Sequence, residues 1–236
     1  MTMQEGQTKY SRFAVYYLPE QPALAEFGAR WLGYDCATGA LRVAPEIAGL
    51  PLPLSTITAK PRRYGFHATV MAPFHLADDR LRGNLETTFA TLCAALQAPV
   101  LDALEVSRLG RFLALTALGD DTQLRAVAGQ VVRGLNGFRA PLGPEDLHRR
   151  TPANATPRQQ ELLQTYGYLY VEEAYRFHIT LTGRLGRDDI LQVQDVLSRE
   201  LAPLVPRPFT VGALVLVGED ERGYFHLLRR AELKPC

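Results

Sequence analysis

The segments Phe66-His67-Ala68-Thr69-Val70 and Phe177-His178-Ile179-Thr180-Leu181 decide the fold. They agree at three of five positions, and each places a histidine and a threonine two residues apart between apolar neighbours. Side chains alternate between the two faces of a β-strand, so the aromatic and aliphatic side chains of each segment share one face. The histidine and threonine share the other. Two strands, each buried on one face and polar on the other, are therefore predicted.

The elements expected after the two motifs occur in the same order. A predicted strand (64–71 and 175–182) is followed each time by an amphipathic helix after an aspartate pair and then by a β-hairpin. The distance from the motif histidine to an aromatic residue of the following hairpin is 45 residues in the first copy and 47 in the second. We therefore expect a duplication, with one unit at 64–118 and the other at 175–230.

The remaining chain supplies the other expected elements. Residues 12–18 read as a strand, and residues 22–32 and 124–135 have the apolar spacing of amphipathic helices. Residues 35–61 and 139–160 are rich in proline and glycine or polar residues, which predicts irregular connections. The second of these contains His148-Arg149-Arg150, which is compatible with a lid over a polyanionic substrate or with a solvated surface connection.

Bulk composition excludes several classes of protein. The chain has 236 residues, of which 47% are hydrophobic and 22% charged, close to the average of globular proteins and unlike disordered or membrane proteins. The formal net charge is +1, from 26 basic and 25 acidic side chains, which disfavours binding to duplex nucleic acid or to an anionic membrane. A small anion or a single nucleic-acid end remains a possible ligand.

The cysteines and the N-terminus point to a reducing compartment. The three cysteines, Cys36, Cys93 and Cys236, are far apart and form no Cys-x-x-Cys pair, so neither a disulfide framework nor a zinc site is expected. Residues 1–10 are polar and lack the layout of a signal peptide, and no apolar run is long enough to span a bilayer. A cytoplasmic location is expected.

The two motifs hold the groups that phosphodiester cleavage requires. Cleavage needs one group that accepts a proton from the attacking oxygen and another that donates a proton to the leaving oxygen. Histidines such as His67 and His178, with an unperturbed pKa of about 6.5, can fill both roles at one pH. Thr69 and Thr180 lie two strand steps away, about 6.6 Å, and can bind non-bridging phosphoryl oxygens. No metal or cofactor is needed. The sequence does not say which histidine is the base.

Strand alternation also predicts which residues bind the substrate. Arg176 and Thr182 fall on the face of His178, and Arg63 falls on the face of His67. The guanidinium of Arg176 could bind two phosphate oxygens or form a salt bridge at the strand end. Tyr16 could stack on a substrate ring or belong to the core.

Three further histidines lie outside the paired motif. His75, His148 and His226 follow neither the His-x-Thr pattern nor a metal-ligand spacing. We interpret them as structural or surface residues.

The paired motifs resemble those of the 2H phosphoesterase superfamily, which includes RNA 2′,3′-cyclic phosphodiesterases and 2′-5′ RNA ligases. Two longer stretches resemble a narrower branch of phosphonate metabolism proteins that is associated with carbon–phosphorus lyase genes. The first is Tyr64-Gly65-Phe66-His67-Ala68-Thr69 with Ala72-Pro73-Phe74. The second is Gly167-Tyr168-Leu169-Tyr170-Val171 with Arg176-Phe177-His178-Ile179-Thr180-Leu181-Thr182. This resemblance covers nearly the whole chain.

The resemblance implies an α+β fold with two pseudo-symmetric lobes of antiparallel sheet, helices outside and a central cleft, in one bilobal domain over residues 1–236. It implies catalysis by His67, Thr69, His178 and Thr180 without a cofactor. The narrower branch implies a cyclic or diester sugar phosphate formed during phosphonate breakdown. Met71 departs from the branch, where lysine is expected; if that lysine binds phosphate, this protein binds its substrate differently.

Three functions follow as hypotheses. The first is hydrolysis of a small cyclic phosphate or phosphodiester by a monomeric enzyme. The second is processing of an RNA end that carries a cyclic phosphate. The near-neutral charge favours the first, because RNA binding depends on neutralising phosphates. The third is a non-catalytic protein that binds a nucleotide or phosphonate, which the intact pairs of histidines and threonines disfavour.

Overall fold

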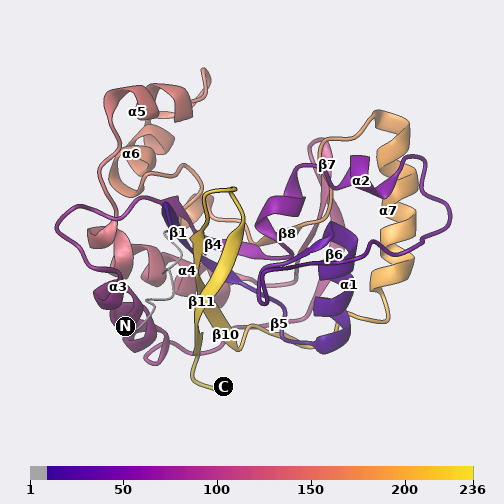
Figure 1. Ribbon diagram of the computed structural model, residues 1–236, viewed down its shortest axis with the longest axis horizontal. Coiled ribbons are helices and arrows are strands. Elements are labelled where there is room, and N and C mark those ends of the chain that lie inside the picture. The colour runs from indigo at the N-terminus through magenta and orange to yellow at the C-terminus, as the bar shows by residue number, and fades with distance from the viewer. Residues whose placement is uncertain (1–9, 236) are drawn as a thin grey trace, which may run out of the picture.

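A computed structural model describes residues 10–235, and its centre is one seven-stranded sheet (Figure 1). All its pairings are antiparallel. In spatial order the strands are β11 (Phe225–Glu232), β10 (Ala213–Glu219), β1 (Arg12–Tyr17), β4 (Ala68–Phe74), β8 (His178–Thr180), β7 (Phe112–Leu118) and β6 (Ala103–Leu109). The α+β class and the antiparallel sheet expected from the sequence are confirmed.

The sheet is nearly divided where β4 meets β8. Only Ala68 and Ile179 are in register there, whereas the neighbouring strand pairs are longer. The four strands β11, β10, β1 and β4 form one part, and β8, β7 and β6 form the other. The hairpin β6–β7 follows β4 in sequence but pairs with β8, and the hairpin β10–β11 follows β8 but joins β4 through β1. Each expected unit therefore supplies strands to both parts.

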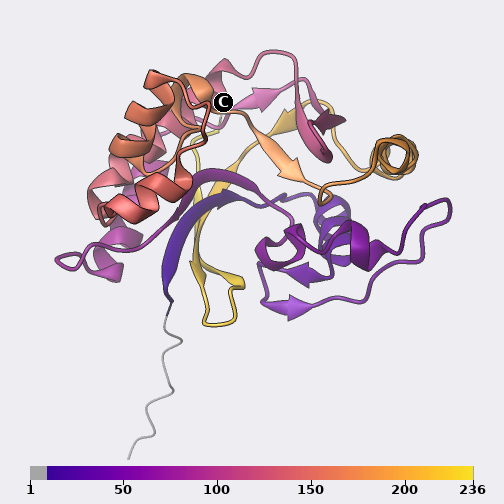
Figure 2. The same ribbon diagram turned by 90° about the horizontal axis from the view of Figure 1, so that it is seen from above.

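Helices lie around this sheet, and Figure 2 shows α7 at one end and the group α4 to α6 at the other. Helix α3 packs on β10 and β11, and α7 packs on β6 and β7. Each of these helices therefore covers the hairpin of the other unit. The helices are α1 (Pro22–Leu32), α2 (Leu54–Ile57), α3 (Arg82–Cys93), α4 (Thr122–Leu135), α5 (Pro144–Arg150), α6 (Pro157–Tyr166) and α7 (Arg187–Leu201).

Several boundaries differ from the sequence expectation. The strand expected at 64–71 begins only at Ala68 and runs on to Phe74, because a 3₁₀ helix, η1 (Pro61–Tyr64), and Gly65 with a φ of 74° precede it. The strand expected at 175–182 is reduced to β8, His178–Thr180. The aspartate pairs also do not cap the helices. Helix α3 begins three residues after Asp79, and Asp188 and Asp189 lie inside the first turn of α7, where their charge favours the helix dipole.

The stretch 139–160, expected to be irregular, contains α5 and the start of α6. A capping box begins α6, since the Thr156 hydroxyl accepts from the Gln159 backbone NH and the Gln159 side chain accepts from the Thr156 NH. This Thr-x-x-Gln pattern is visible in the sequence, so the helix could have been predicted. The helices expected at 22–32 and 124–135 and both hairpins are confirmed.

Short elements complete the fold, and one of them, β2, helps to cover the second face of β1. The pairs are β2 (Tyr34–Asp35) with β3 (Ala40–Leu41) and β5 (Val100–Leu101) with β9 (Phe209–Thr210). Two further 3₁₀ helices are η2 (Asn136–Phe138) and η3 (Glu172–Ala174). A second core cluster, distinct from the main core, includes Tyr16, Tyr34, Cys36 and Phe225. Strand β1 is therefore buried on both faces from Phe13 to Tyr17, which explains the apolar run that follows Arg12.

Helix α1 packs against the segments of both motifs. The Trp31 indole NH donates to the Leu181 carbonyl oxygen at 2.7 Å. A Cβ atom built on Gly28 would lie 2.0 Å from Phe66 Cδ1. The glycine is therefore required for this close approach.

We expect Gly28→Ala to lower the free energy of unfolding by about 1–3 kcal/mol, since overpacking displaces the Phe66 ring. Urea denaturation measures this change. Gly83→Ala in α3 is the matched control, because nothing lies within 4 Å of a Cβ there. Equal stability of the two variants would contradict the packing argument.

Candidate active site

The two motifs lie side by side at the junction of β4 and β8. Ala68 pairs with Ile179 in an antiparallel register. Continuing that register places Thr69 opposite His178, and His67 opposite Thr180. The apolar positions of both motifs are buried, with exposed fractions of 5% or less for Phe66, Ala68, Val70, Phe177, Ile179 and Leu181. The alternation predicted from the sequence is confirmed, and the four polar side chains share one face.

The imidazole of His67 is held by two hydrogen bonds. Its Nδ1 lies 3.0 Å from the Gly65 carbonyl oxygen, and its Nε2 lies 3.1 Å from Thr69 Oγ1. A carbonyl oxygen only accepts, so Nδ1 carries the proton and donates it. In the neutral ring, Nε2 then accepts from the Thr69 hydroxyl. The Nε2 lone pair therefore lies on the polar face of the sheet, where the Thr69 hydroxyl occupies it.

Gly65 is the residue that allows this arrangement. Its φ is 74°, in the left-handed region that favours glycine. A Cβ atom at this position would lie 2.7 Å from Cys36 Cβ. The glycine therefore brings its carbonyl oxygen under His67 without a clash.

Burial distinguishes His67 from an ordinary surface histidine. The Tyr16 ring stacks on the imidazole with the ring centroids 3.7 Å apart and 24° between the planes, and Tyr16 itself is fully buried. Burial lowers the pKa of His67 to about 4, the bond to Gly65 opposes this shift, and the nearby His178 adds to it. His67 is therefore neutral at physiological pH.

His178 repeats the backbone arrangement of His67 in a different environment. Its Nδ1 lies 2.9 Å from the Arg176 carbonyl oxygen, so this nitrogen also donates to the residue two positions before it. The nearest aromatic ring is Phe112, with a centroid distance of 6.2 Å and a tilt of 54°. No tyrosine stacks on His178 in residues 10–235. The Nε2 atom makes no hydrogen bond with any described residue and is free to meet a ligand.

Two adjoining cavities open on the polar face. The His67 cavity has a volume of about 380 Å³, and its lining includes His67, Thr180, Phe112 and Tyr64. The His178 cavity has a volume of about 660 Å³, and its lining includes His178, Thr69 and Phe112. Each cavity thus combines the histidine of one motif with the threonine of the other, as the register of β4 and β8 requires. Phe112 borders both cavities.

The charge of the two cavities is positive. Lys60 and Arg184 line the His67 cavity, and Arg108 and Arg176 line the His178 cavity. Among the described residues, no carboxylate lines either cavity. A concave site with cations and without acids fits an anionic ligand.

Arg176 and Thr182 have different positions. The Arg176 side chain is exposed and makes no ion pair with a described residue, so the salt bridge considered from the sequence is not formed. Thr182 lines the His67 cavity, but its hydroxyl donates to the Gly183 carbonyl oxygen at 2.8 Å and accepts from the Leu113 NH at 3.0 Å. Thr182 therefore joins β8 to β7, and its hydroxyl is already satisfied by the backbone.

Arg63 and Tyr16 do not occupy the predicted positions. Strand alternation does not apply to Arg63, because residues 61–64 form η1, and its exposed side chain lines neither cavity. Tyr16 has no exposed surface and lies behind His67. Its ring supports the imidazole instead of stacking on a substrate.

The structure adds site residues that the sequence analysis did not single out. Tyr64 is 41% exposed at the His67 cavity, and Tyr170 is 49% exposed at the His178 cavity. Gln159 and Tyr168 also line the His178 cavity. Tyr168 and Tyr170 lie two residues apart shortly before the second motif. This spacing was the sequence signal that could have predicted aromatic residues at the site. Gln159 belongs to α6, so part of the stretch 139–160 reaches the site.

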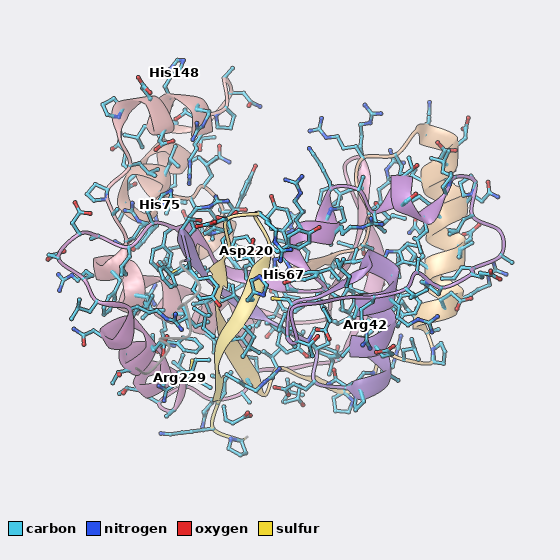
Figure 3. The ribbon with its side chains drawn as sticks, viewed as in Figure 1. Arg42, His67, His75, His148, Asp220 and Arg229 are labelled. Atoms are coloured by element: carbon cyan, nitrogen blue, oxygen red, sulfur yellow. The ribbon has the colours of Figure 1, made fainter. Side chains whose placement is uncertain are left out.

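The other histidines are structural or surface residues, as expected. The imidazole of His75 contacts the Ser11 carbonyl oxygen at 2.9 Å, and His226 Nε2 lies 2.9 Å from Asp220 Oδ2. His148 lies on α5, far from His67 (Figure 3). The exposed position of His148 gives no support to a lid role for this residue.

Other features bear on metals, disulfides and membranes. Within residues 10–235, no group of three or more His, Cys, Asp or Glu side chains could hold a metal ion. Cys36 and Cys93 are buried and unpaired, and Cys236 lies outside the described residues. None of the described helices is long and apolar enough to cross a membrane.

Curated relatives share sequence with most of this chain. The chain is 36% identical over 219 residues to a protein of Janthinobacterium sp. (strain Marseille) named ribose 1,5-bisphosphate phosphokinase PhnN. The aligned region covers 90% of this chain and 48% of that protein. A protein of the same name from Laribacter hongkongensis (strain HLHK9) is 33% identical over 182 residues. This aligned region covers 76% of this chain and 42% of that protein. The chain spans about half the length of these relatives.

Solved structures show more distant likeness. A crystal structure described as a phosphoesterase aligns with a TM-score of 0.41 and 15% identity over 95% of this chain and 99% of the other. E. coli LigT complexed with 3′-AMP aligns with a TM-score of 0.43 and 13% identity over 96% of this chain and 99% of the other.

A family model described as a protein of unknown function (DUF1045) matches residues 69–226. Since this match spans most of the sequence, the chain belongs to the DUF1045 family.

Proposed function

We propose that this protein is a phosphoesterase that hydrolyses a small phosphodiester by general acid and base catalysis. The observation that carries the proposal is that His67 and His178 share one face of the sheet where β4 and β8 adjoin. Each donates its Nδ1 hydrogen to a backbone carbonyl, so each presents Nε2 to the same face. The cavities beside them hold cations and, in the described part of the chain, no carboxylates.

The environments of the two histidines suggest their roles. A general base must start without a proton, and burial keeps His67 neutral. With substrate bound, the Thr69 hydroxyl would turn from His67 Nε2 to a non-bridging oxygen, and Nε2 would accept a proton from the attacking water as the water oxygen bonds to phosphorus. His178, in its protonated form, would donate a proton to the ester oxygen as the phosphorus–oxygen bond breaks. Thr69 and Thr180 are placed to bind non-bridging oxygens, and Arg176 to neutralise their charge.

The proposed substrate is a cyclic phosphate of a phosphorylated sugar. The relatives named above are described as kinases of ribose 1,5-bisphosphate, and this chain matches about half of each. Hydrolysis of one ester bond of 5-phosphoribosyl 1,2-cyclic phosphate adds one water and yields ribose 1,5-bisphosphate. A phosphodiesterase joined to such a kinase would supply its substrate. This link agrees with the role in phosphonate metabolism that the motif resemblance implies.

Processing of RNA ends is a second candidate function. The exposed aromatic rings of Tyr64 and Tyr170 at the two cavities could stack on unpaired bases. The net charge of +1 makes a long RNA the weaker candidate.

The proposal is tested by an assay that compares substrates in the presence of a chelator. We expect 5-phosphoribosyl 1,2-cyclic phosphate to be hydrolysed faster than 2′,3′-cyclic nucleotides or RNA with a cyclic phosphate end. Activity should persist in EDTA, because the proposed steps use only side chains of the chain. Preference for RNA would favour the second candidate. Activity lost in EDTA and restored by a metal would contradict the mechanism, and binding without turnover would indicate a non-catalytic protein.

A further inference from the structure

The two cavities have different sizes and different relations to the two histidines. In phosphoryl transfer the attacking and leaving oxygens lie roughly in line on opposite sides of phosphorus. If His67 is the base, the water approaches from the side of His67. The leaving oxygen, and the group attached to it, then lie on the side of His178. This step rests on the proposed function.

The His178 cavity is the larger one, at about 660 Å³ against about 380 Å³. Its lining includes two aromatic rings, Tyr168 and Tyr170, which contact each other edge to face at a centroid distance of 5.5 Å. Gln159, whose side chain carries an amide, also lines it. Aromatic surface with an amide donor and acceptor suits a sugar, which combines apolar faces with hydroxyl groups.

Each cavity is lined by two cationic residues, Lys60 and Arg184 beside His67 and Arg108 and Arg176 beside His178, which together exceed what one phosphodiester monoanion requires. The larger cavity beside His178 has more room for a second anionic group. Arg108, on β6, donates through Nε to the Gly110 carbonyl oxygen at 2.8 Å and makes no ion pair with a described residue. The Arg176 side chain likewise has no ion-pair partner in the described part of the chain. Arg176 belongs to the segment of the second motif, whereas Arg108 belongs to the opposing hairpin. The two cations therefore approach the cavity from different elements.

We infer that the His178 cavity is the leaving-group subsite, where Arg108 binds a phosphomonoester carried by the substrate in addition to the scissile diester. Arg176 is nearer to the motif in sequence and serves the scissile phosphate. The substrate is then a sugar or nucleoside that bears both a cyclic phosphate and a terminal phosphate. Arginine suits this role because its planar fork binds two phosphate oxygens.

The test compares two substrates that differ only in the terminal phosphate. These are 5-phosphoribosyl 1,2-cyclic phosphate and ribosyl 1,2-cyclic phosphate. We expect Arg108→Ala to lower kcat/KM for the phosphorylated substrate by about 10- to 100-fold, mainly through KM, since a hydrogen bond to a charged group contributes that much to binding. The unphosphorylated substrate should change little. A phosphorylated cyclic nucleotide, adenosine 2′,3′-cyclic phosphate 5′-phosphate, distinguishes a nucleoside from a sugar as the leaving group.

Arg111→Ala is the matched control, because Arg111 is an exposed arginine of the same hairpin that lines neither cavity. It removes the same charge and should leave the ratio of the two kcat/KM values unchanged. Equal losses for both substrates in Arg108→Ala, or equal kcat/KM values in the wild type, would overturn the inference.

Binding of ribose 5-phosphate, measured by calorimetry, separates this inference from the proposed function. If the wild type hydrolyses neither substrate but binds ribose 5-phosphate through Arg108, the catalytic proposal fails and the subsite stands. If the substrates are hydrolysed and Arg108→Ala binds ribose 5-phosphate as well as Arg111→Ala does, the subsite assignment fails alone. Absence of both turnover and binding rejects both.

Discussion

Replacing His67 or His178 with glutamine is expected to lower kcat by about 10²- to 10⁴-fold, the usual contribution of a general acid or base. Glutamine keeps a polar side chain of similar length but cannot exchange a proton near neutral pH. The two losses should not multiply in the double variant, because base and acid act in the same step. Steady-state kinetics on the best substrate measure these changes.

The matched control is His148→Gln, since His148 is exposed on α5 and lies away from the site (Figure 3). It should retain wild-type turnover. Circular dichroism and thermal denaturation establish that the His67 and His178 variants are folded. Turnover that persists in both single variants would falsify the mechanism.

The second large effect concerns the ring of Tyr16 and the pH dependence of the reaction. Tyr16 excludes water from one face of His67, and burial lowers the pKa of His67 to about 4. A histidine base works only without its proton, so a lowered pKa extends activity to lower pH. The wild-type profile of kcat/KM should therefore decline on the acid side near pH 4.

Tyr16→Leu removes the stacked ring and should move this acid limb toward the unperturbed pKa of about 6.5. At pH 5 the unprotonated fraction of His67 would then fall by about 30-fold for a full shift. Tyr16→Phe is the matched control, because it keeps the ring and removes a hydroxyl that is buried without a hydrogen-bond partner among the described residues. An unchanged acid limb in Tyr16→Leu would show that the ring does not set the pKa.

Stability provides a readout of the same pKa that needs no substrate. The pKa of His67 is about 4 in the folded protein and about 6.5 in the unfolded chain. The unfolded chain therefore binds more protons between these values, and the free energy of unfolding falls as pH drops from about 6.5 to about 4. This part of the pH dependence should be absent in His67→Gln. Its presence there would assign the effect to another group.

The local sequence was sufficient to predict which side chains form the polar face of each motif. Alternation along a strand depends on backbone geometry alone, so placing His67 beside Thr69 and His178 beside Thr180 required no knowledge of the fold. Helix α1 and helix α4 were equally predictable from apolar spacing. The same argument failed for Arg63, because η1 interrupts the alternation before β4 begins.

Tertiary structure decided how the motifs combine. More than one hundred residues separate β4 from β8, and only their register sets His67 opposite Thr180 and His178 opposite Thr69. The hydrogen bonds that occupy the Thr182 hydroxyl come from the backbone of Gly183 and from Leu113, on the neighbouring segment. Arg108 reaches the site from a hairpin that carries no motif.

The sequence by itself determined which side chains could do the chemistry, because residue type and strand alternation are local properties. Only the tertiary structure decided their surroundings. The Tyr16 ring stacks on His67, and burial lowers the pKa of His67, whereas no tyrosine of the described residues stacks on His178. Burial arises from residues distant in sequence, so no local pattern could reveal that His67 is held without its proton.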